Sequence, residues 1–281
     1  FYTIISRILG YLRDILIAIF LGTSFMADAF FVAFRIPNTF RRLFAEGTFN
    51  AAFVPLFAKR YESNMEPKEF ANNVFANLLT LLLILTSIAM VFMPGLVFLT
   101  AAGFASDQRF DLTVDFGRII FPYILLISLA ALFSGILNTT GRFAMAAAAP
   151  VILNIIIVVA LLMAWATQRN IMEWLVWSIP IAGIVQLSLL WLATYKTGIK
   201  ITLSLPKWNK DIGNLIRLAI PAALAGGVLQ INLLVGQLVA SQETGAISFL
   251  YFADRLYQLP LGIAGIAVGT VPVSYTHLTL P

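Results

Sequence analysis

Long apolar stretches recur along this chain, and they limit what it can fold into more than any other feature. A helix needs about 20 predominantly apolar residues to cross the hydrocarbon core of a bilayer. Several stretches reach that length, in a sequence that is 60% hydrophobic and only 11% charged. Segments of about 10 residues with alternating polarity, typical of membrane β-barrels, are not visible in the sequence. The pattern predicts an all-α, polytopic helical membrane protein.

We expect eight membrane-spanning helices. Seven of them contain proline, which predicts kinked or broken helices, a feature more common in transporters than in simple membrane anchors. The spans cover roughly residues 3–22, 26–57, 73–102, 117–137, 143–166, 172–195, 214–240 and 247–272. Their prolines are Pro37, Pro55, Pro94, Pro122, Pro150, Pro180, Pro221 and Pro260.

The lysines predict the orientation of the chain. They fall only between the second and third spans and between the sixth and seventh: Lys59, Lys68, Lys196, Lys200, Lys207 and Lys210. The alternate connections hold only Arg109 and Arg169. The positive-inside rule then places the lysine-bearing loops and the N-terminus in the cytoplasm. A loop that sets topology on an anionic leaflet accounts for the basic stretch 196–210, so we expect no nucleic-acid partner.

An unusually polar segment, residues 28–46, lies inside one of the apolar runs. On a helix at about 100° per residue, its polar side chains fall mainly on one face. These are Asp28, Arg35, Asn38, Arg42 and Glu46, with Arg41 about 100° away. The stripe indicates either substrate contact and gating or ion pairing inside the bundle. Arg42 and Glu46, four residues apart, are placed to pair with each other.

Arginine, unlike lysine, occurs inside the expected spans. The positions include Arg7, Arg13, Arg35, Arg41, Arg42 and Arg255. Each would cost about 2.5–3.5 kcal/mol at mid-bilayer if it faced lipid. We therefore expect these side chains to face a wet cavity or paired acids. Because guanidinium stays charged and grips phosphate or carboxylate at two points, the set favours a cavity for an anionic group.

Acidic and amide side chains accompany the arginines on the first and last spans. Asp14 directly follows Arg13, and we expect it to pair with an arginine. On the last span, Asp254, Arg255 and Gln258 share one face. Substrate contact or gating and structural pairing both remain open for Asp254 and Arg255.

Other classes of protein fit the sequence less well. No phosphate-binding loop, paired-histidine metal site or nucleophile elbow is visible, so we expect neither an enzyme nor a cofactor or metal. A membrane glycosyltransferase would usually carry acidic metal-binding clusters in a loop, and a membrane scaffold would not need intramembrane arginines. A drug exporter would be expected to line its cavity with acids. An exporter of another lipid-linked glycan stays open.

Six short motifs are spread over most of the chain. Residues 6–14 read SRILGYLRD, 28–38 read DAFFVAFRIPN, 41–47 read RRLFAEG, 121–129 read FPYILLISL, 136–138 read ILN and 251–256 read YFADRL. In combination they resemble the MurJ/MviN family, the lipid II flippases of bacterial peptidoglycan synthesis. That family belongs to the larger multidrug/oligosaccharidyl-lipid/polysaccharide exporter group. The resemblance extends to about Val273.

The resemblance implies about fourteen transmembrane helices, in two six-helix lobes and a terminal pair. Residues 1–195 would form the first lobe, 196–213 a basic cytoplasmic linker, and 214–273 the first two helices of the second lobe. Spans 2 and 8 share a short pattern that matches Arg35 to Arg255, as a parallel repeat of two halves would. Residues 274–281, which include His277, change abruptly in composition, and we expect them to be a non-native tail.

The resemblance also implies a function and its residues. The family moves undecaprenyl-diphosphate-linked disaccharide-pentapeptide (lipid II) between leaflets of the bacterial inner membrane by alternating access. The implied partners are lipid II and membrane lipids, with cell-wall synthesis proteins as a further candidate class. Gln258 stands where some members have Glu. The implied diphosphate-binding residues are Arg7, Arg13, Arg41 and Arg255; the expected gating or ion-pairing residues are Asp14, Asp28, Arg35, Asn38, Arg42, Glu46, Asp254 and Gln258.

Overall fold

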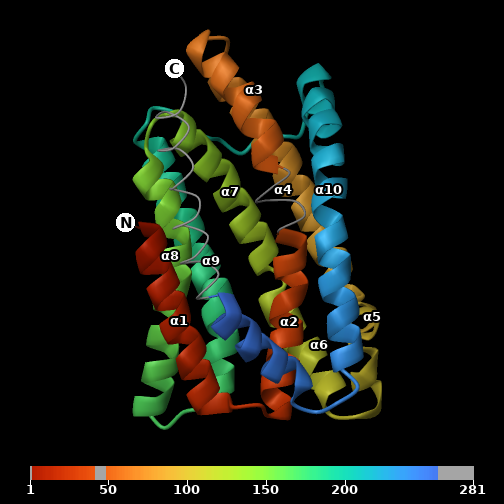
Figure 1. The fold of residues 1–281 in the computed structure, drawn as a ribbon. Coiled ribbons are helices and arrows are strands. Elements are labelled where there is room, and N and C mark those ends of the chain that lie inside the picture. Colours follow the sequence, from red (N-terminus) through yellow and green to blue (C-terminus); the bar gives the residue numbers. More distant parts are fainter. Residues whose placement is uncertain (1, 42–48, 259–281) are drawn as a thin grey trace, which may run out of the picture.

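The computed structural model of this chain describes residues 2–41 and 49–258 (Figure 1). These residues form helices joined by loops, with no strand among them, which confirms the predicted all-α class. Residues 246–258 form a last helix after a turn at 241–245. The preceding elements are α1 (Tyr2–Leu21), α2 (Phe25–Arg41), α3 (Asn50–Glu62), α4 (Pro67–Val91), α5 (Met93–Thr100), the 3₁₀ helix η2 (Ala102–Ser106), α6 (Arg109–Ile120), α7 (Tyr123–Thr139), α8 (Phe143–Ala166), α9 (Ile171–Tyr195) and α10 (Lys210–Ala240).

Four stretches of the described chain are long and apolar enough to cross a membrane. They are Pro67–Val91, Gln108–Thr139, Phe143–Ala166 and Ile171–Tyr195. Large apolar side chains such as Leu99 and Trp165 are more than half exposed on the helices, as expected of surfaces that face lipid. The total of eight spans stays a prediction.

The expected span boundaries are correct in some places and wrong in others. The fifth and sixth expected spans coincide with α8 and α9 to within one residue. The second expected span, 26–57, is described as two helices, α2 and α3, and residues 42–48 lie outside the described residues. The last expected span is helical from 246 to 258, and its remainder, like the expected tail, also lies outside them.

Proline marks two of the helix breaks that interrupt the expected spans. The third expected span divides at Phe92, and Pro94 lies in the first turn of α5. The fourth divides just before α7, where Pro122 is the N-cap residue. Proline suits a helix start, because the first turn needs no N–H donor. Other prolines, such as Pro150 and Pro180, lie inside continuous helices, so proline alone did not identify the breaks.

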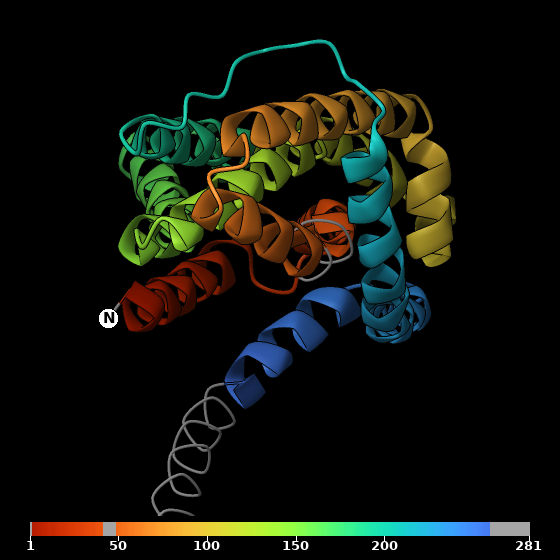
Figure 2. The same cartoon turned by 90° about the horizontal axis from the view of Figure 1, so that it is seen from above.

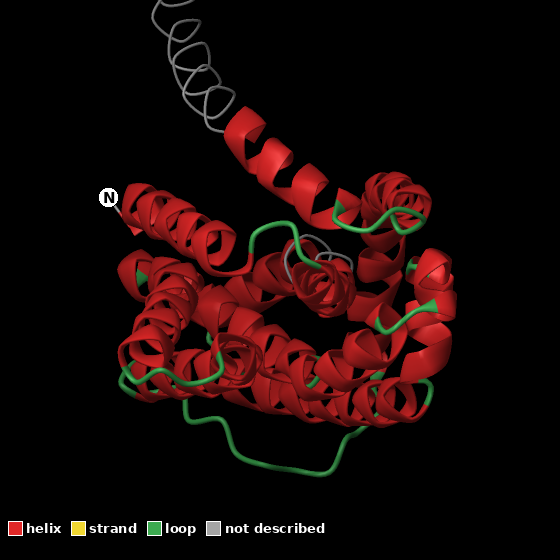
Figure 3. Ribbon diagram, turned by 90° about the horizontal axis from the view of Figure 1, so that it is seen from below, coloured by secondary structure: helices red, strands yellow, loops and turns green. Residues whose placement is uncertain are grey.

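The helices pack side by side and run between two ends of a bundle (Figure 1). Helix α8 contacts both α1 and α9, α7 contacts α9, and α2 packs on α6. Gly183 of α9 permits the close approach of α7, since a Cβ at this position would lie 2.8 Å from Cδ2 of Tyr123. Seen along the bundle, α10 and the helix 246–258 stand at its edge (Figures 2 and 3).

One end of the bundle, which we call the lysine end, carries the connection 196–209. Figure 2 shows this connection arcing around the outside of the bundle past α4. Amide side chains of α4 hold it: Oδ1 of Asn72 accepts from the N–H of Thr202, and Oδ1 of Asn73 accepts from that of Lys207. Arg60 of α3 pairs with Asp211 at the start of α10, Nη2 to Oδ1 2.5 Å. The connection is therefore tied to the bundle before α10 begins.

Candidate functional site

Two guanidinium groups meet at one buried carboxylate in the bundle. Arg13 and Asp14 of α1 are 7% and 5% exposed. The Nε and Nη2 groups of Arg13 donate to Oδ1 of Asp14 at 2.9 and 2.7 Å. Oδ2 of the same carboxylate pairs with Nε of Arg255 at 3.1 Å. Because Arg255 lies on the helix 246–258, Asp14 joins arginines from two helices far apart in the sequence.

The hydroxyl group of Tyr251 lies between these groups. It donates to Oδ1 of Asp14 at 3.1 Å and accepts from Nη2 of Arg255 at 3.1 Å and from Nη2 of Arg13 at 3.4 Å. The ring stacks on Phe31 of α2, with centroids 4.0 Å apart. Helices α1 and α2 and the helix 246–258 therefore meet at this tyrosine.

Asn154 of α8 completes the set from the other side. Its Oδ1 accepts from Nη1 of Arg13 at 2.9 Å, and its Nδ2 donates to the backbone carbonyl of Ser6 at 3.0 Å. Asn154 is 6% exposed, so both bonds are made away from water. We name Arg13, Asp14, Asn154, Tyr251 and Arg255 the Arg13–Arg255 cluster.

The charge of this cluster is not balanced internally. It holds two guanidinium groups and one carboxylate, a formal charge of +1. Neighbouring Asp254 is exposed, and its carboxylate accepts from Nε2 of Gln258. The side chain of Arg255 is 36% exposed, whereas that of Arg13 is 9% exposed. An anion approaching the cluster would therefore meet Arg255 first.

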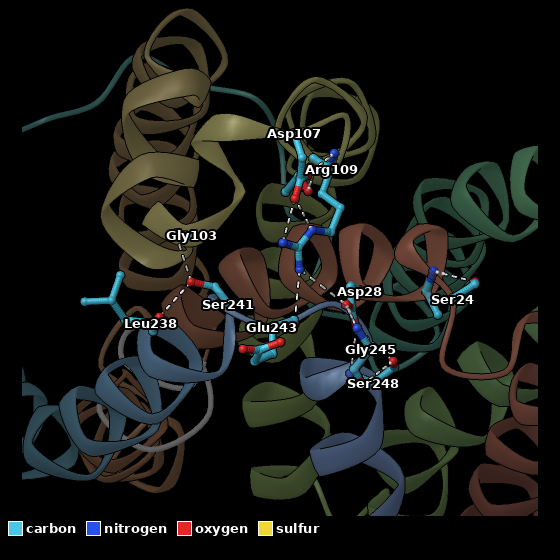
Figure 4. Close-up of polar contacts among 12 residues, drawn as sticks. Ser24, Asp28, Gly103, Asp107, Arg109, Leu238, Ser241, Glu243, Gly245 and Ser248 are labelled. Carbon is cyan, nitrogen blue, oxygen red and sulfur yellow. Dashed lines mark hydrogen bonds and ion pairs between the residues drawn. The ribbon is translucent and has the colours of Figure 1, made fainter.

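A second polar cluster, drawn in Figure 4, lies near the start of α6, at the end of the bundle opposite the lysine end (Figure 1). Asp28 of α2 is 0% exposed. Its carboxylate accepts from the N–H of Gly245 at 2.6 Å and, at Ser248, from the N–H at 2.9 Å and the hydroxyl at 2.7 Å. The first N–H groups of a helix lack partners within the helix, and a negative charge there is favourable. Asp28 therefore caps the helix 246–258 from a different helix.

Arg109, at the start of α6, links the same carboxylate to two other segments. Its Nη1 lies 3.7 Å from Oδ2 of Asp28 and donates to the backbone carbonyl of Glu243 at 3.2 Å. Its Nη2 pairs with Oδ2 of Asp107 at 2.6 Å. The hydrogen bond from Arg109 lowers the pKa of Asp107 below its ordinary value of 3.8. We name Asp28, Asp107, Arg109, Gly245 and Ser248 the Asp28–Arg109 cluster.

Close backbone packing extends this second cluster along α10. The N–H of Gly103 donates to Oγ of Ser241 at 3.0 Å, and Nε2 of Gln237 donates to the carbonyl of Thr100 at 3.0 Å. A Cβ at Gly103 would lie 2.4 Å from the backbone oxygen of Ser241. The segment from α5 to α6 is thus held against the turn between α10 and the last helix.

The remaining site residues expected from the sequence do not gather at one point. Arg7 is exposed on α1, and Arg35 is half-buried on α2. The side chain of Asn38 donates to the carbonyl of Phe34 in its own helix at 2.9 Å. Of the predicted stripe, Asp28 lies in the second cluster. The side chain of Arg41 and all of Arg42 and Glu46 lie outside the described residues.

Sequence reasoning missed several residues of both clusters. Arg109 was expected in a connection between spans, but it is 4% exposed and bonded on both sides. Asp107 and Ser248 carried no signal, since their importance comes from segments that meet only in the fold. Asn154 did carry one: it is an amide within the otherwise apolar helix α8, and a buried polar group requires partners.

Two pockets of the described structure lie away from both clusters. One of about 250 Å³, at the lysine end, is lined by Arg60, Asn73 and Lys207 among others. The other, of about 270 Å³, is lined by residues of α2, α6 and α9, including Phe116 and Trp177. The two clusters, rather than these pockets, therefore hold the buried charged groups that need a functional account.

Comparison with known families decides among the transporter classes. A family model described as "Lipid II flippase MurJ" matches residues 17–274. This chain belongs to the MurJ family. The match confirms the resemblance derived from the six motifs, and it includes every residue of the Asp28–Arg109 cluster.

Individual MurJ relatives agree with this assignment. "Probable lipid II flippase MurJ" of Rhizobium tropici is 48% identical over 276 residues, covering 96% of this chain and 52% of the relative. The protein of the same name from Rickettsia prowazekii is 36% identical over 273 residues, covering 96% of this chain and 54% of the relative. The chain spans about half the length of the curated relatives it matches. Their names describe transport rather than catalysis, which confirms the expectation of a non-enzymatic family.

Two solved structures of membrane transporters have a fold similar to that of this chain. A structure titled "Lipid II flippase MurJ, inward closed conformation" matches with a TM-score of 0.80 and 31% identity, over 96% of this chain and 56% of that chain. A multidrug resistance MATE family transporter of the MOP superfamily, in an inward-facing conformation, matches with a TM-score of 0.66 and 16% identity, over 90% of this chain and 58% of that chain. The second likeness shows the fold alone. Together they confirm a MATE-like, polytopic membrane transporter fold.

Proposed function

We propose that the protein containing this chain moves lipid II from the cytoplasmic to the periplasmic leaflet of the bacterial inner membrane. The observation that carries this proposal is the Arg13–Arg255 cluster, in which two guanidinium groups share one carboxylate. A diphosphate supplies the negative charge that the cluster lacks, and guanidinium binds phosphate oxygens at two points. Such pairs are strong where water is excluded.

The geometry favours exchange of the partners of Arg255 when the lipid binds. In the structure, the three nitrogens of the Arg255 guanidinium each have a partner. Nε pairs with Asp14, Nη2 donates to Tyr251 and Nη1 donates to Gln258. Because its side chain is partly exposed, a diphosphate oxygen reaches Arg255 before Arg13 and replaces the Asp14 carboxylate there. Asp14 keeps a bond to Arg13 while the diphosphate contacts both guanidinium groups, so the carboxylate is not left without a positive partner. No covalent bond is made or broken, and no cofactor is needed.

Alternating access would also need one end to open while the other stays closed. The positive-inside rule places the lysine end and the N-terminus in the cytoplasm. The Asp28–Arg109 cluster then lies on the periplasmic side, where it ties α2 and α6 to the turn before the last helix. We propose that it keeps the periplasmic end closed. Rocking of two six-helix lobes, 1–195 and a second lobe that begins at 214, would break it.

The other residues expected from the sequence keep their proposed roles. Arg7 and Arg41 would add positive charge along the path of the head group. Arg35, Asn38, Arg42, Glu46, Asp254 and Gln258 would pair with charged groups as the lobes move. Membrane lipids surround the helices, and cell-wall synthesis proteins are the proposed protein partners.

Growth of a flippase-depleted strain tests the proposal. The full-length protein with Arg13→Ala or Arg255→Ala should fail to restore growth while its abundance in the membrane stays normal. Arg142→Ala, which removes an exposed arginine at the lysine end, is the matched control and should restore growth. Arg255→Lys should rescue poorly, since an ammonium group cannot make two parallel bonds. Normal growth with either alanine variant of the cluster contradicts the site.

A further inference from the structure

Besides Gln258, which accepts from Arg255, two neutral side chains hold the guanidinium groups of the Arg13–Arg255 cluster in place. Asn154 bonds to Arg13, and the hydroxyl of Tyr251 bonds to both Arg13 and Arg255. We propose that Asn154 and Tyr251 are positioning residues, which keep two like charges together so that one anion can bind both. The inference rests on the proposed function, because it gives these residues a role at the same site.

The orientation of Asn154 is fixed by its second bond. The backbone oxygen of Ser6 can only accept, so the amide nitrogen of Asn154 must face it, and the amide oxygen must face Arg13. A Cβ at Gly10 of α1 would lie 3.4 Å from Nδ2 of Asn154, an ordinary contact distance, so α1 and α8 pack against each other here. Helix α8 therefore fixes Arg13 through an acceptor that carries no charge.

The hydroxyl of Tyr251 uses all of its bonding capacity within the cluster. A phenol has one O–H to donate and can accept two hydrogen bonds. Here it donates to Asp14 and accepts from Arg13 and Arg255. The ring is held by stacking on Phe31, and the guanidinium of Arg255 lies 5.0 Å from its centroid. The hydroxyl oxygen of Tyr251 is therefore held by the packing of its ring and by its own hydrogen bonds. Both guanidinium groups bond to this one oxygen.

These contacts matter most when the Asp14 carboxylate leaves Arg255. Without it, the two guanidinium groups repel each other, and Arg255, at 36% exposure, has room to turn away. Tyr251 and Asn154 keep their bonds to the arginines, since a diphosphate competes only for the position of Asp14. Less side-chain entropy is then lost on binding, because the arginines are already ordered. Preorganised sites gain affinity in this way.

The test uses the full-length protein and two readouts. Tyr251→Phe removes one oxygen and keeps the ring on Phe31; Tyr257→Phe, the same change at a residue 65% exposed on the same helix, is the matched control. Asn154→Leu removes the acceptor for Nη1 of Arg13. The first readout is the rate at which phenylglyoxal modifies Arg255 or Arg13 without any lipid, measured by mass spectrometry. The second is the Kd for lipid II, with the unfolding temperature recorded alongside.

Positioning predicts that Tyr251→Phe speeds the modification of Arg255 several-fold and weakens lipid II binding about tenfold, the range expected for a hydrogen bond to a charged group. The unfolding temperature should not change in Tyr251→Phe, and neither readout should change in the Tyr257→Phe control. If Arg255→Ala abolishes binding while Tyr251→Phe alters neither readout, the positioning role is wrong and the proposed function stands. If the wild type binds no lipid II but Tyr251→Phe still speeds the modification of Arg255, the proposed function is wrong and the positioning role of Tyr251 is supported. Should Asn154→Leu fail to fold, Tyr251→Phe decides alone.

Discussion

Oδ1 of Asp28 lies 2.9 Å from the backbone nitrogen of Ser248, so a carboxylate on α2 caps a helix that begins almost at the other end of the described chain. The same residue pairs with Arg109 at 3.7 Å. A buried charge survives only when it is paired and hydrogen-bonded, and Asp28 meets both conditions. This contact holds α2, α6 and the last helix together at one end of the bundle.

Replacing Asp28 by Asn should lower stability by about 2–3 kcal/mol, because the amide places N–H groups against donors of Gly245 or Ser248. The measurement is thermal unfolding in detergent. Asp115→Asn, at an exposed position on α6, is the control and should change stability by about 0.5 kcal/mol or less. Equal effects of the two variants would mean that Asp28 is not a cap.

A double-mutant cycle tests whether Asp28 and Arg109 act as a pair. We expect Arg109→Gln and Asp28→Asn together to cost less than the sum of their separate effects by about 1 kcal/mol, since each single change leaves a buried charge less compensated. The exposed Arg169→Gln supplies the control cycle with Asp28→Asn. Simple additivity of the Arg109 cycle would contradict the pair.

Gly103→Ala should separate η2 from the turn after α10. The new Cβ would lie 2.4 Å from the backbone oxygen of Ser241, which cannot rotate away as a side chain would. We expect a loss of about 1–3 kcal/mol in unfolding free energy. Gly95→Ala is the matched control, since nothing lies within 4 Å of a Cβ there. A loss at Gly95 as large as at Gly103 would rule out the steric explanation.

The pairing of Asp107 with Arg109 predicts how the stability of the protein depends on pH. The hydrogen bond from Arg109 lowers its pKa in the folded protein, so its stabilising contribution is present above the ordinary value of 3.8 and is lost only as the pH falls through the lower, folded value. The difference in unfolding temperature between the wild type and Asp107→Asn should therefore stay constant from neutral pH to about pH 5. A difference that disappears over that interval would show that Asp107 is not paired as described.

Much of the fold follows from the sequence because apolar length and periodicity act locally. Helices α8 and α9 match the expected boundaries to within one residue, since each is one largely apolar stretch bounded by polar residues. The prolines predict kinks or breaks but not which of them divide a helix: α4 and α5 are separate helices at Pro94, whereas Pro180 is accommodated inside α9. Which proline breaks a helix depends on the neighbours that satisfy the freed backbone groups.

The candidate site, too, could be predicted from the sequence only in part. The cost of burying a charge selects Arg13, Asp14 and Arg255 from the sequence, and the fold brings these three together. The partners of Asp28 were not predictable in this way. Gly245 and Ser248 contribute backbone N–H groups, which every residue except proline has, and the Ser248 hydroxyl is one of many in the chain, so the sequence does not single them out.

We propose that Arg13 and Arg255 together bind a diphosphate. The most direct measurement is the affinity of the full-length protein for lipid II compared with the same lipid carrying an uncharged linkage in place of the diphosphate. We predict that the wild type and the Arg142→Ala control strongly prefer the diphosphate lipid, and that Arg255→Ala loses the preference. Equal affinity of the wild type for both lipids, or an undiminished preference in Arg255→Ala, would contradict the claim.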